Sequence, residues 1–255
     1  HLGNHEKAIE DFKTAIRLNP DHCDPYISLG HVYADLGQFE KAIDEYNKAV
    51  KADPDNAYTY NHRGITYCNL EKFDNAIEDF NKALDLDPDY FDAFSNRVKT
   101  LMDTGELEKA LEDLNKAISI NPDDEVLLAN RGSVFAKLGQ FNKAISDYNE
   151  AIRLDPENES LFFNRGCFYG NINENEKAIG DFNRAVSINP DVADTYFNRA
   201  SIYSQLGQFE KEVEDHNKAI EIDPDNYQYH TNRGTAHANL NEFEKAIEDY
   251  SKAIS

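Results

Sequence analysis

One row of residues with hydrogen-bonding chemistry recurs in this sequence at a fixed step of 34 positions. Its members, the asparagine row, are Asn96, Asn130, Asn164, Asn198 and Asn232. Each side-chain amide offers two donors and an acceptor, so it can pair with both the N–H and the C=O of a peptide backbone. We favour the interpretation that the row binds an extended peptide. The alternative is that duplication of a repeated segment copied the asparagine without any use for it.

A second row, of arginines, lies one residue after the asparagine row. The arginines are Arg63, Arg97, Arg131, Arg165, Arg199 and Arg233, and an aspartate follows each of them at the same spacing, at Asp79, Asp113, Asp147, Asp181, Asp215 and Asp249. A planar guanidinium and a carboxylate make a bidentate pair. The complete repeat that has Leu29 in the arginine's place has Glu45 in the aspartate's place, so the two positions vary together. This favours structural ion pairs over the alternative, a row of cations for an anionic ligand.

Three histidines replace aromatic residues of the repeated pattern near the end of the chain. They are His216, His230 and His237, and no carboxylate or cysteine joins them in a ligand spacing. Imidazole is a common metal ligand, so a metal site is one interpretation. We favour the other, that the histidines fill aromatic positions, and we expect no metal.

The cysteines and the known catalytic motifs give no sign of redox or enzymatic chemistry. Cys23, Cys68 and Cys167 lie far apart and form no C-x-x-C pair, which favours a reducing compartment, with the cytoplasm as the expected location. The sequence has no phosphate-binding loop, no G-x-S-x-G and no H-E-x-x-H. We therefore expect a protein that is not an enzyme and that needs no cofactor.

The same period keeps these side chains in register along the whole chain. Prolines mark it at Pro20, Pro54, Pro88, Pro122, Pro156, Pro190 and Pro224. Within 125–158, the apolar and small residues recur at helical spacing and predict a first helix that ends at Gly139. A second helix follows and ends at Asp155, because the residue before a proline leaves the α region. The sequence therefore predicts an all-α protein with two helices in each repeat.

The repeat resembles the tetratricopeptide repeat (TPR). The pattern aromatic-x-x-x-Gly-x-x-Tyr, Leu-Gly-x-Phe, Ala-Ile-x-x-Tyr-x-x-Ala and then Pro recurs at this step, with departures such as Val98 and Ala200 in the place of the first glycine. In that register the complete repeats are 23–56, 57–90, 91–124, 125–158, 159–192 and 193–226. Residues 1–22 are the second helix of a partial repeat and 227–255 are a truncated repeat, so we expect one array, 1–255, that is cut at both ends. The family implies an α-solenoid whose helix-turn-helix units form a right-handed superhelix.

The resemblance implies a location for the asparagine row. In the family the first helices line a concave groove, and the row falls at a position that faces it. There it is similar to the asparagine ladder that holds extended peptide backbone in the TPR arm of O-GlcNAc transferases. Phe163 and Phe197, each one residue before an asparagine of the row, would add an apolar platform. The carboxylate clamp of TPR co-chaperones is not expected, because its positions carry no lysine or arginine.

Charge narrows the class of partner. The formal net charge of −22 argues against nucleic acid and against an anionic membrane surface, since both are bound by clustered cations. We expect a neutral or basic protein or peptide, and the oligomeric state stays open. The predicted function is a non-catalytic scaffold that binds an extended peptide or a helix in the concave groove. The alternative is the substrate-recruiting arm of an enzyme whose catalytic domain lies outside these residues.

Overall fold

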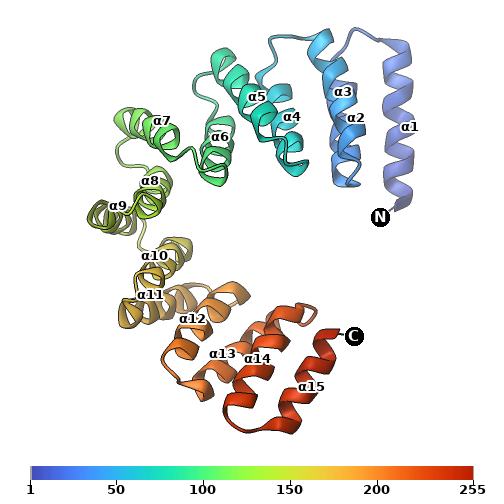
Figure 1. Cartoon of the computed structure of the whole chain (residues 1–255). Helices are drawn as coiled ribbons and strands as arrows, with labels where there is room; N and C mark the ends of the chain where they lie inside the picture. Colours follow the sequence, from blue (N-terminus) through green and yellow to red (C-terminus); the bar gives the residue numbers. More distant parts are fainter. Residues whose placement is uncertain (1, 255) are drawn as a thin grey trace. The chain divides into compact units, whose positions relative to one another are not determined.

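The computed structural model describes residues 2–254, and all regular secondary structure within that range is α-helical. The helices are α1 (Leu2–Leu18), α2 (Asp24–Asp35), α3 (Phe39–Ala52), α4 (Ala57–Asn69), α5 (Phe73–Leu86), α6 (Phe91–Asp103), α7 (Leu107–Ile120), α8 (Glu125–Lys137), α9 (Phe141–Leu154), α10 (Glu159–Asn171), α11 (Asn175–Ile188), α12 (Ala193–Gln205), α13 (Phe209–Ile222), α14 (Tyr227–Asn239) and α15 (Phe243–Ile254). From α2 onward they form consecutive pairs, in which the first helix has an even number and the second an odd number (Figure 1).

The turn inside each pair depends on one residue with left-handed backbone. Gly139, between α8 and α9, has φ 70°, and Gly207, between α12 and α13, has φ 68°. The same place is occupied by Glu71 with φ 57° and by Asn173 with φ 61°. A left-handed conformation costs an L-residue other than glycine about 1–2 kcal/mol, and asparagine tolerates it better than most. The turns after α4 and α10 are therefore less favourable locally than those that contain glycine.

The boundary between repeats depends on proline and on a helix cap. After α9, Asp155 is extended, with φ −129° and ψ 88°, as a residue before proline prefers to be. The next helix, α10, is capped by Asn158, whose side chain accepts a hydrogen bond from the backbone N–H of Ser160. This cap satisfies one of the N–H groups that a helix start leaves unpaired.

Small residues let the two helices of a pair approach closely. Gly64 of α4 faces Phe80 of α5, and a Cβ at Gly64 would lie 2.6 Å from the Phe80 ring. Phe80 and the neighbouring Ala76 and Ala83 are fully buried. The side chain of the second helix therefore fills the space that the glycine leaves open, and this packing outweighs the cost of roughly 1 kcal/mol that glycine brings to a helix relative to alanine.

The chain forms two compact units, divided between Asp113 and Leu114. Within the first unit, α4 contacts α6; within the second, α8 contacts α10 and α10 contacts α12. Within the units, second helices also contact the first helix of the next repeat, as α9 contacts α10 and α11 contacts α12. Stacked repeats in each unit thus bury their apolar faces against their sequence neighbours. Within residues 2–254, no helix combines the length and the apolarity that crossing a membrane requires.

Candidate functional site

The arginine row forms bidentate pairs between the two helices of a repeat. Nε of Arg63 donates to Oδ2 of Asp79 at 2.7 Å, and its Nη2 donates to Oδ1 at 2.6 Å. The equivalent bidentate pairs are Arg131–Asp147, Arg165–Asp181, Arg199–Asp215 and Arg233–Asp249. Arg97 forms an ion pair with Asp113, in which Nε lies 2.9 Å from Oδ2. The carboxylates are largely buried; the side chain of Asp215, for example, is 7% exposed. The arginine side chains therefore face the second helices of their own repeats, and their guanidinium groups are not a row of free cations.

Each of these arginines has a further partner that the sequence analysis missed. Nη1 of Arg165 donates to Oδ1 of Asn149 at 2.6 Å, and Asn149 belongs to the second helix of the preceding repeat. The same bond joins Arg63 to Asn47, Arg97 to Asn81, Arg131 to Asn115, Arg199 to Asn183 and Arg233 to Asn217. We call each set of three side chains an Arg–Asp–Asn clamp. One guanidinium thus holds together three helices of two repeats.

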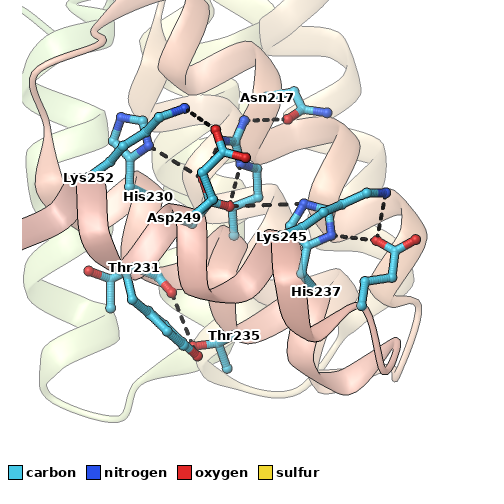
Figure 2. A network of polar contacts seen from close by, with 12 residues as sticks. Asn217, His230, Thr231, Thr235, His237, Lys245, Asp249 and Lys252 are labelled. Atoms are coloured by element: carbon cyan, nitrogen blue, oxygen red, sulfur yellow. Dashed lines mark hydrogen bonds and ion pairs between the residues drawn. The ribbon is translucent and has the colours of Figure 1, made fainter.

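The three histidines lie beside carboxylates, although the sequence analysis named no carboxylate in a ligand spacing with them. Figure 2 shows Asp249 of α15 between His230 and His237, with ion-pair distances of 3.8 Å to Nδ1 of His230 and 4.0 Å to Nε2 of His237. Nδ1 of His237 also bonds Glu242 at 2.6 Å. Burial opposes ionisation of Asp249, but the hydrogen bonds and charge of Arg233 hold its pKa below the ordinary value, with help from the two histidines.

His216 has its own carboxylate, on the same helix. Its Nε2 lies 3.8 Å from Oε1 of Glu212. Glu212 stands one helical turn before His216, so this pair could have been found in the sequence. Among residues 2–254, the group whose metal-binding atoms converge is a different one, His22, Cys23 and Asp24 at the start of α2. Those side chains are consecutive and mostly exposed, and the Asp53 carboxylate lies beside them, 3.9 Å from Sγ of Cys23.

The asparagine row lies on first helices, and its members differ in what they bind. Nδ2 of Asn96 donates to Oδ1 of Asn61 at 3.0 Å, and Nδ2 of Asn198 donates to the backbone carbonyl of Asp194 at 2.8 Å. Within the described residues, the amides of Asn130, Asn164 and Asn232 have no hydrogen-bond partner. All three are at least partly exposed. We call the side of α8, α10, α12 and α14 that carries the row the asparagine face.

Phe163 and Phe197 are half-buried and pack against the second helices of their own repeats. The Phe163 ring lies 6.0 Å from that of Phe182, and the Phe197 ring lies 5.7 Å from His216 and 5.2 Å from Tyr229. Part of each ring therefore belongs to the core. A ligand on the asparagine face would meet the remaining edges, which is a smaller apolar surface than two exposed phenylalanines would provide.

The first unit has aromatic and imidazole rings near the corresponding place. His62 stands in register with the asparagine row, and its ring lies 4.4 Å from that of His31 and 4.1 Å from that of Tyr58. Burial lowers the pKa of His62 to about 4, and the neighbouring His31 adds to the effect. The imidazole of His62 is therefore neutral at neutral pH, and this stack presents rings where the second unit presents amides.

Comparisons with known proteins identify the repeat. A profile described as TPR repeat matches residues 1–37, 30–71, 99–139 and 132–172, which is more than half of the chain. Two profiles described as tetratricopeptide repeat match 57–90 and 227–255, and 159–192 and 193–226. A search of curated protein sequences finds no match.

Solved structures with the same fold have low sequence identity to this chain. A tetratricopeptide repeat protein from Parabacteroides merdae is 21% identical, with 91% of each chain covered and a TM-score of 0.69. The APC/C hetero-tetramer Cut9-Hcn1 is 18% identical over 98% of this chain and 49% of that chain, with a TM-score of 0.67. MamA from Desulfovibrio magneticus is 23% identical over 63% of this chain and 91% of that chain, with a TM-score of 0.56. At these identities the likeness shows the fold.

Proposed function

Because this chain belongs to the tetratricopeptide repeat family, we propose that it is a non-catalytic scaffold that binds an extended segment of another protein along the asparagine face. The observation that carries the proposal is that the amides of Asn130, Asn164 and Asn232 have no partner within residues 2–254, although each lies in mid-helix on a first helix. Asparagine is a mediocre helix former. An exposed amide with free donors and a free acceptor is suited to bind peptide backbone.

The spacing of the helices suits an extended peptide. In the second unit α8 contacts α10 and α10 contacts α12, and packed helices lie about 8–10 Å apart. An extended chain advances about 3.3 Å per residue. One amide would therefore meet roughly every third residue of the peptide, and the contacts would be to backbone and largely independent of the peptide's sequence.

The charge of the scaffold supports a neutral or basic partner. The formal net charge of the chain is −22, and Asp194 on α12 is exposed on the helix that carries Asn198. An acidic peptide would be repelled during approach, whereas a basic one would be attracted at low ionic strength. The Cut9 structure of the same fold is that of a protein in a hetero-tetramer, which agrees with a role in protein assembly.

The proposal is tested by replacing the three free amides together. A peptide is first selected from a random display library on the wild-type chain, and its affinity is measured by fluorescence anisotropy. The variant with Asn130, Asn164 and Asn232 replaced by alanine should keep its fold, since alanine is the better helix former, and should bind the peptide about tenfold more weakly or worse.

The matched control replaces exposed residues on the second helices of the same three repeats. Asn142, Glu176 and Glu244 occupy one equivalent place in these repeats and are exposed. Replacing them with alanine should leave the affinity unchanged. If the folded asparagine variant binds as tightly as the control, the peptide does not use the asparagine face.

A further inference from the structure

The second helix α13 carries two polar side chains where the neighbouring second helices have an apolar pair. In α11 the pair is Ala178 and Phe182; in α13 it is Glu212 and His216. Glu212 is 4% exposed and His216 is 1% exposed. A carboxylate and an imidazole therefore occupy the centre of a repeat, at a place where the fold is otherwise apolar.

These two side chains do not satisfy each other. The distance of 3.8 Å between Nε2 of His216 and Oε1 of Glu212 is longer than a hydrogen bond. Oε2 of Glu212 and Nδ1 of His216 have no hydrogen-bond partner among residues 2–254. Buried polar atoms are nearly always hydrogen-bonded, and an unpaired buried carboxylate is costly. A carboxylate in this position is suited to a group that arrives from outside the chain.

A pocket connects the buried pair to the asparagine face. It has a volume of 360 Å³ and is lined by Glu212 and His216 of α13, Ser204 and Gln205 of α12, and Asn232 and Thr235 of α14. This volume lies toward the small end of the range of about 300–1,000 Å³ that ligand pockets have. The lining provides hydroxyl and amide groups around one carboxylate. Because Asn232 belongs to the asparagine row, the pocket opens beside the proposed path of the peptide.

We propose that this pocket receives a basic side chain, a lysine or an arginine, whose cationic group donates hydrogen bonds to the Glu212 carboxylate. For a side chain that belongs to a bound peptide, the inference rests on the proposed function. The carboxylate accepts charge-assisted hydrogen bonds, and the side-chain carbonyls of Gln205 and Asn232 can accept further ones. The pocket thus adds side-chain selectivity to contacts that otherwise involve only peptide backbone.

Other occupants fit the pocket less well. An anionic group would be repelled by Glu212, and an apolar side chain would leave Oε2 of Glu212 unsatisfied. A divalent metal would find one carboxylate and one imidazole in the pocket, short of the three or four protein ligands that zinc sites have. A basic side chain satisfies the carboxylate and also reduces the net negative charge of the complex.

The test uses small probes on the whole chain, so that it does not depend on the peptide. The chain is labelled with ¹³C-histidine and titrated with N-acetyl-arginine amide and N-acetyl-lysine amide, while NMR follows the imidazole of His216, assigned by the loss of its signal in His216→Gln. N-acetyl-citrulline amide and N-acetyl-norleucine amide serve as neutral probes of similar shape. We expect a saturable shift with the cationic probes and none with the neutral ones.

Two variants separate the pocket from general charge. Glu212→Gln keeps the size of the side chain and removes the charge, and it should abolish the shift. Glu210→Gln removes the same charge from an exposed place on α13 and should leave the shift intact. The inference is overturned if neither cationic probe shifts His216, if the neutral probes shift it equally, if Glu212→Gln responds like the wild type, or if Zn²⁺ shifts it where the cationic probes do not.

The two proposals can fail separately. If the selected peptide still requires Asn130 and Asn164 while the cationic probes leave His216 unchanged, the pocket is wrong and the scaffold function stands. If the probes bind but the asparagine variant captures the peptide as well as the wild type, the pocket stands and the proposed path of the peptide is wrong. For a peptide that binds both the asparagine face and the pocket, replacing its basic residue by norleucine should weaken binding to the wild type about tenfold. The same replacement should have little effect on binding to Glu212→Gln.

Discussion

The neighbouring repeats that contain α11 and α13 share their helix pairing and their Arg–Asp–Asn clamps, but two buried side chains of the second helix differ between them. In α11, Ala178 and Phe182 are fully buried, and the Phe182 ring fills the space beside Gly166, where a Cβ would lie 2.9 Å from it. In α13 the same two places hold Glu212 and His216, and the residue that corresponds to Gly166 is Ala200. The imidazole is smaller than the phenyl ring, so there is room for a methyl group on the first helix.

The clamp is the same in both repeats. Arg165 bonds Asp181 and Asn149, and Arg199 bonds Asp215 and Asn183, all at 2.6–2.8 Å. The two repeats therefore share the clamp and differ in two buried residues of the second helix that we call the inner pair, Ala178 and Phe182 in α11 and Glu212 and His216 in α13. This arrangement suggests a division of tasks, in which the clamp and the stacked helices supply stability while the inner pair can be exchanged for a ligand pocket.

The largest loss of stability should follow from removing the buried aromatic ring of the inner pair in α11. Phe182→Ala removes a fully buried ring and should destabilise its repeat by about 3–5 kcal/mol. His216→Ala should cost less than half of that, because the imidazole has an unsatisfied Nδ1 that the change removes. Native-state hydrogen exchange of the amides in α11 and α13 measures each local stability. Equal losses would show that the two inner pairs contribute alike to stability.

The clamps should contribute equally in the two repeats. Arg165→Leu and Arg199→Leu each leave a largely buried aspartate without its partner and should cost on the order of 3 kcal/mol. Adding Asp181→Asn or Asp215→Asn should recover much of the loss, since an amide is less costly to bury unpaired than a carboxylate. Urea denaturation of the single and double variants measures this. A clamp whose loss has no effect in one repeat would contradict the shared framework.

Much of this framework could be predicted from sequence, because it repeats. The covariation of Leu29 with Glu45 indicated that arginine and aspartate are neighbours, and the helical spacing predicted both helices of each repeat. The asparagines of the clamp were missed, although Asn149 and Asn183 are also separated by one full period. A row with that period can contact its own repeat or the next one, and the sequence alone does not decide between them.

The inner pair of α13 shows a second limit on what can be predicted from the sequence. Glu212 and His216 were visible as exceptions to the repeat, and their spacing of one helical turn was a usable signal. Whether they form a pocket depends on the volumes of the residues around them and on which polar atoms remain without partners. Likewise, the period continues unchanged across Asp113 and Leu114, where the structure divides into two units, and no change in the repeat pattern marks that division.

Replacing Glu212, the carboxylate of the inner pair in α13, should stabilise the protein. Glu212→Ala restores the alanine that α11 has at this place and removes a buried oxygen without a partner, so we expect a gain of about 1–2 kcal/mol. The same variant should lose the response of His216 to basic probes. Thermal unfolding measures the gain in stability, and the NMR titration measures the loss of probe binding. A destabilised Glu212→Ala would mean that the carboxylate is satisfied within the chain.

The smallest predicted effect comes from replacing one glycine on the outer side of α11, where the equivalent residue of α13 is not a glycine. Gly180 has no atom within 4 Å of where a Cβ would lie, and the equivalent residue of α13 is Glu214. Gly180→Ala should therefore stabilise α11 by roughly 1 kcal/mol, because alanine is the better helix former and meets no obstacle. The matched control is Gly166→Ala in the same repeat, which should be destabilising because its Cβ would collide with the Phe182 ring. Hydrogen exchange in α11 should slow in the first variant and accelerate in the second. If both variants shift exchange in the same direction, helix propensity and packing do not act at these two positions as the structure implies.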